Sequence, residues 1–161
     1  EFRRVLFRSS LYFNVDNGSG KLRGIYTQGN AAARASFADW FGQVSDLSDG
    51  VITNNSTGST DHASFDQVGL PGFQFIQDPL DYFTRLHHTD VDAYDHALPD
   101  DMKQAAVVLA TFVYQAAQAE ARLPRKPMPA EPSAAEQQTE GQKAAQRARA
   151  RERRALSGES R

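Results

Sequence analysis

The sequence predicts an α/β fold in which a sheet lies between helices. Short segments rich in β-branched and aromatic residues alternate with longer segments whose apolar residues recur at helical spacing. The acidic residues are also biased: of the 14 between Leu11 and Ala121, 13 are Asp, which disfavours helix interiors and favours turns, caps and metal sites. This bias predicts loops that hold a ligand.

Four segments are expected to form strands, because they are short and rich in aromatic residues, Val and Ile. They are Leu11–Val15, Leu22–Thr27, Val51–Thr53 and Phe73–Ile76. Turn residues separate the first two. The second is therefore expected either to close a hairpin with the first or to lie at the sheet edge.

Three helices are expected between and after these strands. The first covers Asn30–Val44, with Asn30 as its N-cap. The second is a short helix over His62–Val68, which Gly69 can end. After a long irregular stretch, a helix over residues 99–121 begins with a proline and carries one apolar stripe.

The two ends of the chain differ from the middle. Residues 1–9 resemble no protein element and, back-translated, match a common sequencing-adapter oligonucleotide, so we expect an artefact there. Residues 10–127 are expected to form the folded part. Residues 128–161 are rich in Ala, Gln and Arg without a hydrophobic stripe, which predicts a disordered basic tail.

Charge and composition exclude some classes of protein. The net charge of −2 combines an acidic middle with a basic C-terminus, where the run Arg147–Arg154 raises nucleic-acid binding as an alternative. No aromatic residue lies in the tail to stack on bases, so a solvated tail is favoured. The absence of cysteine excludes disulfides and thiolate metal sites, and no apolar run is long enough to span a bilayer.

Asp16 directly follows the first expected strand. Because α/β sheets bind ligands at the carboxyl ends of strands, a metal ligand is one interpretation. An ordinary turn aspartate is the other. The loop is not an EF-hand, because Gly18 and Thr27 would occupy ligand positions.

Asp61 and His62 follow a loop rich in Gly, Ser and Thr. Either Asp61 caps the short helix, or the loop lines a cleft in which Asp61 and His62 face a substrate. A Ser-His-Asp triad with Ser59 or Ser64 is disfavoured, because the sequence has no Gly-x-Ser-x-Gly elbow.

The third candidate site is an irregular segment that holds two histidines and two carboxylates. Its members are His87, His88, Asp90 and Asp92. A neutral imidazole binds metals through one ring nitrogen while carboxylates often orient the other. A metal site and an ordinary pair of surface histidines are both open interpretations. His96 is expected to be a solvated loop residue.

Taken together, these segments resemble metallopeptidase family 28, which contains two-zinc aminopeptidases and carboxypeptidases. The resemblance covers about residues 10–127, and its closing part looks most like the carboxypeptidase Q branch. It rests on the order and spacing of Tyr12–Gly18, Thr60–Phe65, Val68–Gly72 and His87–Asp92.

The resemblance implies the C-terminal half of a zinc exopeptidase fold, with a mostly parallel sheet sandwiched between helices. Asp16 matches the strand-end aspartate that binds one zinc, and His88 matches the histidine that binds the other. Asp61 and His62 match residues that line the substrate cleft.

Two further residues are matched beside the histidine ligand. His87 lies where some relatives place a group that helps to polarise the scissile carbonyl, and Asp92 matches an acid that supports the metal site or its loop.

The resemblance also implies a missing half. Family members carry a first His, a bridging Asp, a catalytic Glu and its neighbouring acidic ligand before the position of Asp16, and this chain contains none of them. In the whole enzyme, zinc would lower the pKa of a bridging water toward about 7 and the Glu would transfer its proton. With about one ligand per zinc, this chain alone is expected to be inactive.

The implied parent is a secreted or periplasmic metallo-exopeptidase that uses two Zn²⁺ to hydrolyse terminal bonds of peptides or dipeptides. No nucleic-acid partner and no membrane span are expected. Two alternatives use the same scaffold: a one-zinc acyl-transferring cyclase and a non-catalytic binding relative. The residues upstream of Asp16 would distinguish them.

Overall fold

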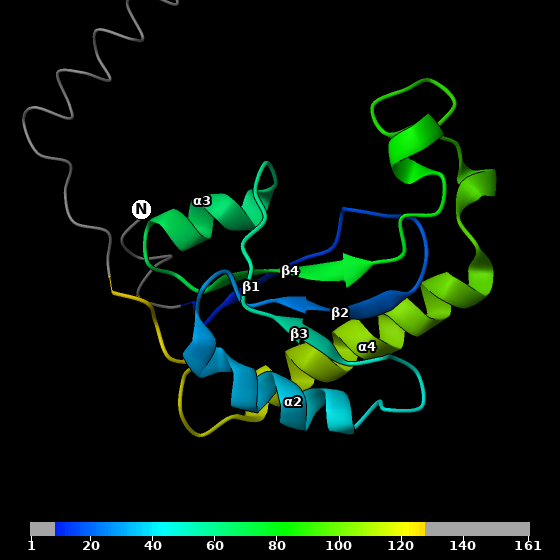
Figure 1. Ribbon diagram of the computed structural model, residues 1–161. Coiled ribbons are helices and arrows are strands. Elements are labelled where there is room, and N and C mark those ends of the chain that lie inside the picture. The colour runs from blue at the N-terminus through cyan, green and yellow to red at the C-terminus, as the bar shows by residue number, and fades with distance from the viewer. Residues whose placement is uncertain (1–8, 128–161) are drawn as a thin grey trace, which may run out of the picture. The chain divides into compact units, whose positions relative to one another are not determined.

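The computed structural model describes residues 9–127, and within them four strands form one mixed sheet (Figure 1). The β1–β4 and β2–β3 pairs are parallel and the β2–β4 pair is antiparallel. The predicted α/β fold with a mostly parallel sheet is therefore confirmed. In the spatial order of the sheet, the strands are β1 (Tyr12–Asn14), β4 (Gly72–Gln77), β2 (Leu22–Tyr26) and β3 (Val51–Thr53).

Both expectations for the second strand are wrong. Strand β2 neither closes a hairpin with β1 nor lies at the edge, because β4 separates it from β1 and β3 covers its other side. The turn after β1 instead runs along the end of β4, where the Gly20 N–H donates to the Asp78 carbonyl at 2.9 Å. The two strands with the most buried residues, β4 and β2, occupy the centre, where both of their edges are paired.

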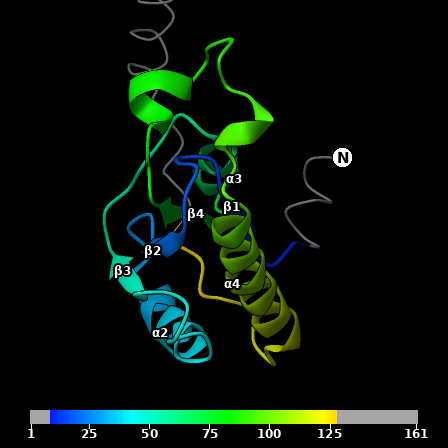
Figure 2. The ribbon, with the colours of Figure 1, turned by 90° about the vertical axis from the view of Figure 1, so that its right-hand side faces the viewer.

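Helices cover both faces of the sheet (Figures 1 and 2). Helices α2 and α4 lie on one face and α3 lies on the other. All three predicted helices form, and where the 3-10 turn before α2 is included their ends lie within three residues of the prediction. They are α2 (Arg34–Gly42) with the preceding 3-10 turn η1 (Ala31–Ala33), α3 (Asp61–Gln67) and α4 (Pro99–Gln118).

Of the two predicted helix caps, Asn30 occupies the N-cap position of η1, whereas Asp61 does not occupy a cap position. The Asn30 side chain makes no cap hydrogen bond and donates instead to the Pro124 carbonyl at 2.7 Å. Asp61 is already the first residue of α3, and Thr60 holds the N-cap position without a side-chain cap hydrogen bond. The capping alternative for Asp61 is therefore wrong.

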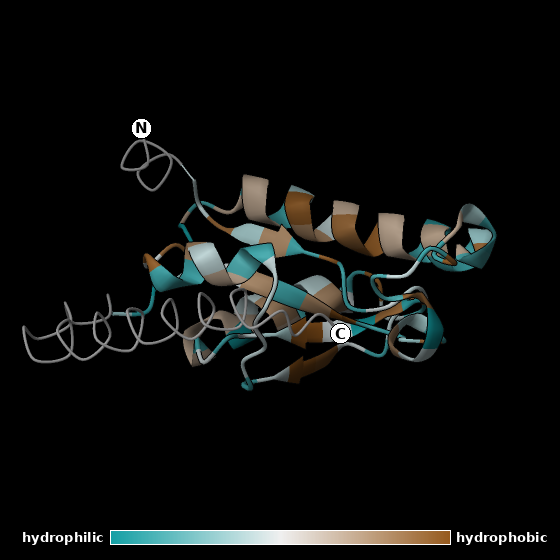
Figure 3. Ribbon diagram, turned by 90° about the horizontal axis from the view of Figure 1, so that it is seen from above, coloured by the Kyte–Doolittle hydropathy of each residue, from teal (hydrophilic) through white to brown (hydrophobic). Residues whose placement is uncertain are grey.

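An aromatic core fills the space between the sheet and the helices α2 and α4. Phe37 of α2 meets Phe73 of β4 edge-on with ring centroids 4.8 Å apart, and Phe112 of α4 lies 5.1 Å from Phe75. Apolar residues run in bands along α4 and the strands (Figure 3). Because burying one such side chain contributes about 1.5–3 kcal/mol, this core holds β1, β4, α2 and α4 in place.

On the opposite face, α3 packs very closely on β4. A Cβ at Gly72 would lie 2.3 Å from the carbonyl oxygen of His62, so only glycine permits this approach. Tyr12 of β1 stacks on Phe65 of α3, with ring centroids 4.2 Å apart. These contacts hold α3 against the first residues of β1 and β4.

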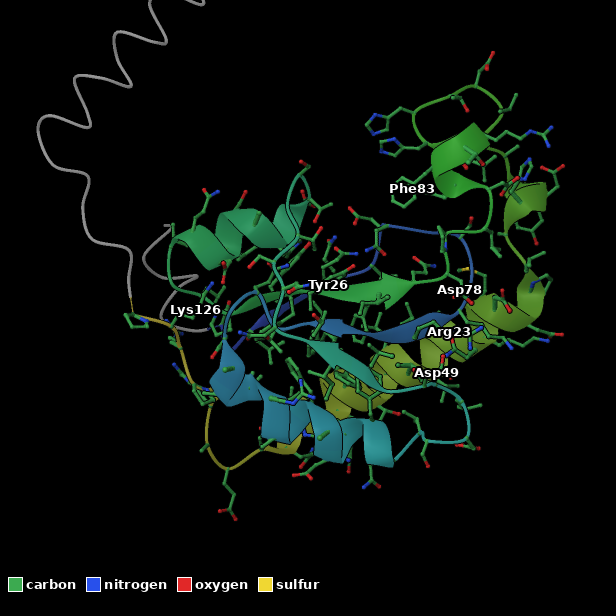
Figure 4. All side chains as sticks on the ribbon, in the orientation of Figure 1. Arg23, Tyr26, Asp49, Asp78, Phe83 and Lys126 are labelled. Atoms are coloured by element: carbon green, nitrogen blue, oxygen red, sulfur yellow. The ribbon has the colours of Figure 1, made fainter. Side chains whose placement is uncertain are left out.

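After α4 the chain returns across the connection between β2 and α2. Leu123 is buried in the core, and Lys126 donates to the Gln28 carbonyl at 2.6 Å and pairs with Asp66 of α3 at 2.7 Å (Figure 4). The predicted tail over residues 128–161 lies outside the described residues, as do residues 1–8 of the predicted artefact.

Candidate functional site

The candidate site lies where two parallel neighbouring strands end. Asp16 follows β1 by two residues and is exposed. Strand β4 runs parallel to β1, and the loop that carries the histidines follows it. Because the carboxyl ends of parallel strands open at the same edge of a sheet, Asp16 and this loop reach the same end of the molecule.

Tyr82 connects the two segments directly. Its hydroxyl donates to the backbone carbonyl of Asp16 at 2.9 Å. Its ring lies 5.1 Å from the ring of His87, which in turn stacks on His88 with centroids 3.8 Å apart. The predicted ligands Asp16 and His88 are thus joined through two intervening side chains, although 72 positions separate them in sequence.

The histidine turn has a defined local structure. It begins with one wide helical turn, η2 (Tyr82–Leu86), which Leu86 anchors because its side chain is buried. The Thr89 hydroxyl donates back to the Leu86 carbonyl at 2.7 Å. His88 has a positive φ of 59°, a backbone conformation that costs a non-glycine residue roughly 1–2 kcal/mol. The turn leaves both His87 and His88 exposed.

Ion pairs of Arg23 hold the start of the same loop against β2. Arg23 contacts the Asp78 carboxylate at 2.7 Å and the Asp49 carboxylate at 3.4 Å (Figure 4). Its hydrogen bond to Asp78 raises the pKa of Arg23 further above its ordinary value. These groups are partly exposed, so the pairs are worth at most about 1 kcal/mol each, but they fix the point from which the loop leaves the sheet.

Two tyrosines show how the carboxylates of the site are distributed. Burial raises the pKa of Tyr12, and the negative charges of Asp61 and Asp16 raise it further. Burial likewise raises the pKa of Tyr82, with further contributions from Asp16 and Asp92. The charge of Asp16 therefore acts on both tyrosines, that of Asp61 on Tyr12 and that of Asp92 on Tyr82.

The two predicted cleft residues, Asp61 and His62, differ in solvent exposure. Asp61 is exposed, whereas the His62 ring is 0% exposed. The hydrogen-bond partners of the ring are Thr60, Gln28 and the Thr57 carbonyl, rather than Ser59 or Ser64 of the disfavoured triad. Of the two residues, only Asp61 can contact a ligand from solvent.

His96 has a partner that the sequence did not indicate. It lies in the short turn η3 (Tyr94–His96), and its Nδ1 is 3.4 Å from the Asp81 carboxylate. Tyr12 and Tyr82 were also not predicted as site residues. A tyrosine beside a strand or in an irregular loop is ordinary, and no spacing in the sequence relates either one to Asp16.

The described residues do not by themselves fit a zinc ion. Between residues 9 and 127, no group of three or more His, Asp or Glu side chains is arranged to hold a metal. Zinc in proteins takes three or four protein ligands. The carboxylate of Asp16 and the imidazole of His88 are suitable in kind, but too few in number.

Comparison with known proteins identifies the family. Across residues 9–127 no helix has the length and apolar character needed to cross a membrane. No curated protein and no solved structure matches the chain. A model of peptidase family M28, a family of metallopeptidases, matches residues 7–113, well over half of the 161 residues. The chain therefore belongs to peptidase family M28.

Proposed function

We propose that this chain is part of a zinc-dependent exopeptidase, in which Asp16 is a ligand of one zinc and His88 a ligand of the other. The substrates are peptides or dipeptides, cleaved at a terminal bond. The observation that supports this most directly is the link through Tyr82, which joins the Asp16 backbone to the histidine turn at 2.9 Å. This contact brings the segments that carry the two proposed ligands to the same end of the sheet.

The remaining candidates surround the proposed ligands and would contact substrate. Asp61 and Asp92 are exposed, and each acts electrostatically on a tyrosine on which Asp16 also acts. Phe83 is 64% exposed, lies 6.1 Å from the His87 ring and offers an apolar surface for a substrate side chain (Figure 4). The proposed role of these residues is to bind and orient the peptide.

Hydrolysis requires groups that the chain does not contain. We place the general base and the other metal ligands in sequence that precedes Asp16 in the parent enzyme. The chain alone is accordingly proposed to be inactive. In the full-length parent, His88→Ala should abolish turnover and leave the fold intact, as judged by circular dichroism.

Weak binding of a single metal ion tests the proposal on this chain. Mn²⁺ accepts carboxylate and imidazole ligands, and its unpaired electrons broaden NMR signals of nearby nuclei. We expect Mn²⁺ to broaden the resonances of Asp16 and His88 together, at the same concentration. Asp16→Asn should weaken the broadening at His88, because a Mn²⁺ ion held by Asp16 would lie beside the metal position of His88, about 3.5–4 Å away.

Asp100→Asn is the matched control, because Asp100 is a highly exposed carboxylate on α4 that is not among the candidate site residues. It should leave the broadening at His88 unchanged. The proposal would be contradicted if Mn²⁺ broadened the resonances of His88 but not those of Asp16. It would also be contradicted if Asp16→Asn and Asp100→Asn had equal effects on His88.

A further inference from the structure

The His62 ring is buried in the first turn of α3, and both of its nitrogens have polar neighbours. Its Nε2 lies 2.6 Å from the Gln28 side-chain nitrogen and 3.1 Å from the Thr57 carbonyl. Its Nδ1 lies 2.5 Å from the Thr60 hydroxyl. Because buried polar groups are stable only when donors meet acceptors, these contacts determine where the ring carries its proton.

Gln28 fixes the direction of the first hydrogen bond. Its side-chain oxygen accepts the Thr57 N–H at 3.0 Å, so the atom that faces His62 is the amide nitrogen, which can only donate. His62 Nε2 must therefore accept. The ring is then neutral, with its proton on Nδ1, and Nδ1–H donates to the Thr60 hydroxyl.

Thr60 continues the chain of hydrogen bonds to the sheet. Its hydroxyl accepts from His62 and donates to the Gln74 side-chain oxygen at 3.3 Å. The same oxygen accepts from the Asn14 amide at 2.5 Å, and Asn14 and Gln74 are paired residues of β1 and β4. The network thus connects the loop before α3 to the last residue of β1, two positions before Asp16.

Other protonation states of His62 do not satisfy these contacts. A hydrogen on Nε2 would have the Thr57 carbonyl at 3.1 Å as its only acceptor, and it would bring two donors together at the nearer contact, the Gln28 amide nitrogen at 2.6 Å. This conflict applies both to the alternative neutral tautomer and to the charged ring. Either state would require the Gln28 side chain to turn and lose its hydrogen bond from Thr57.

We propose that His62, as the neutral tautomer protonated on Nδ1, is a positioning residue that fixes Asp61 relative to Asp16. The importance of these two carboxylates rests on the proposed peptidase function, whereas the hydrogen-bond assignment stands on the contacts alone. Asp61 is the next residue after Thr60, and the charges of Asp61 and Asp16 both act on Tyr12, which stacks against α3.

The first test reads the tautomer directly. Long-range ¹⁵N–¹H NMR spectra of the 161-residue chain with labelled histidine distinguish protonated from unprotonated ring nitrogens. We expect His62 to show a protonated Nδ1 and an unprotonated Nε2. The opposite tautomer, or a ring protonated on both nitrogens at neutral pH, would overturn the proposal. Neither zinc nor turnover enters this measurement, so its failure is distinct from failure of the peptidase assignment.

The second test compares Thr60→Val with Thr60→Ser. Valine removes the hydroxyl that joins His62 Nδ1 to Gln74, so the backbone resonances of Asp16 and Asp61 should both shift, whereas Gln28 should keep the proton off Nε2. The Ala63 amide, which donates to the Thr60 carbonyl at 3.1 Å, should exchange about fivefold faster if the lost hydrogen bond is worth about 1 kcal/mol. Serine keeps the hydroxyl and should preserve the tautomer and the resonances.

A valine variant whose Asp16 and Asp61 resonances stay in place would overturn the proposal. So would a serine variant that loses the tautomer. If the valine variant does not fold, the wild-type spectrum and the serine variant still decide the assignment.

Discussion

Gly72 determines how closely α3 approaches the sheet, and with it the position of Asp61. A Cβ at this position would lie 2.3 Å from the His62 carbonyl oxygen, a backbone atom that moves only if α3 moves. We expect Gly72→Ala to lower the free energy of unfolding by about 1–3 kcal/mol, the typical cost of overpacking. Urea denaturation measures this change.

Gly42→Ala provides the matched control. Gly42 is the last residue of α2, and no atom lies within 4 Å of a Cβ built there. Alanine should leave the stability unchanged or raise it by up to about 1 kcal/mol. Equal free energies of unfolding for Gly72→Ala and Gly42→Ala would show that α3 can shift without loss of stability.

At the level of single residues, the sequence indicated the ionisable members of the site more readily than their neighbours. Asp16 and His88 were candidates because an aspartate after a strand and paired histidines are compatible with metal ligands, and the resemblance assigned them to the two zincs, which stays a prediction. Tyr82 could not be predicted, because its role depends on a carbonyl 66 positions away. His62 was predicted from the resemblance as a cleft residue, but nothing in the sequence indicated that its ring would be buried.

At the level of elements, local signals were sufficient for helices but not for strand order. Helix α4 begins at a proline and carries an apolar stripe, and both features lie within the segment itself. Strand β2 pairs with β4, which begins about 50 residues later in the sequence, so no local signal indicates this pairing. A turn between β1 and β2 was therefore compatible with a hairpin that the sheet does not form.

Strand β1 leaves one edge of the described sheet unpaired, since its only partner there is β4. A groove of about 440 Å³ lies beside this edge, between β1 and α4. Among its lining residues are the apolar side chains of Leu11, Phe13, Leu109 and Val113. An open edge beside apolar surface promotes association, so we expect the chain to self-associate as its concentration rises. Sedimentation velocity over a concentration series measures this.

Val113→Glu should reduce that association, because it places a charge in the groove at a side chain that is already half-exposed. Tyr114→Glu is the control, since Tyr114 is more exposed and does not line the groove. A monomer at all concentrations, or equal effects of both substitutions, would contradict the role of this groove.

Across the whole molecule, the site is made by segments that are distant in sequence. Asp16 follows β1, Asp61 begins α3 and Asp92 lies in the loop after β4. The parallel pairing of β1 with β4 and the close packing of α3 on both strands bring the three carboxylates around Tyr12 and Tyr82. The sequence predicted these residues as separate motifs, and only the topology relates them.

This arrangement predicts weaker folding at alkaline pH. Tyr12 and Tyr82 have raised pKa values in the folded chain, whereas the unfolded chain has the ordinary value of about 10. The unfolded state therefore loses these protons first, so their contribution to stability is complete below about pH 10 and is lost as the pH rises beyond it. Urea denaturation on both sides of that pH should show the decrease, and Tyr82→Phe should make it smaller.

Asp16→Asn tests the central position of Asp16. Because its charge acts on both rings, the substitution should lower the pKa of Tyr12 and the pKa of Tyr82 together. NMR titration of the tyrosine ring carbons follows each group separately. Asp49→Asn, which removes a carboxylate paired with Arg23, should change neither value.

The two flanking carboxylates should act selectively. Asp61→Asn should lower the pKa of Tyr12 and leave Tyr82 unchanged, whereas Asp92→Asn should do the reverse, because each charge acts on only one of the two rings. This crossed pattern is expected if the charge of Asp16 acts on both Tyr12 and Tyr82 while each flanking charge acts on one. If Asp16→Asn shifted the pKa of only one tyrosine, Asp16 would belong to one segment alone, and the shared two-zinc site would lose its geometric support.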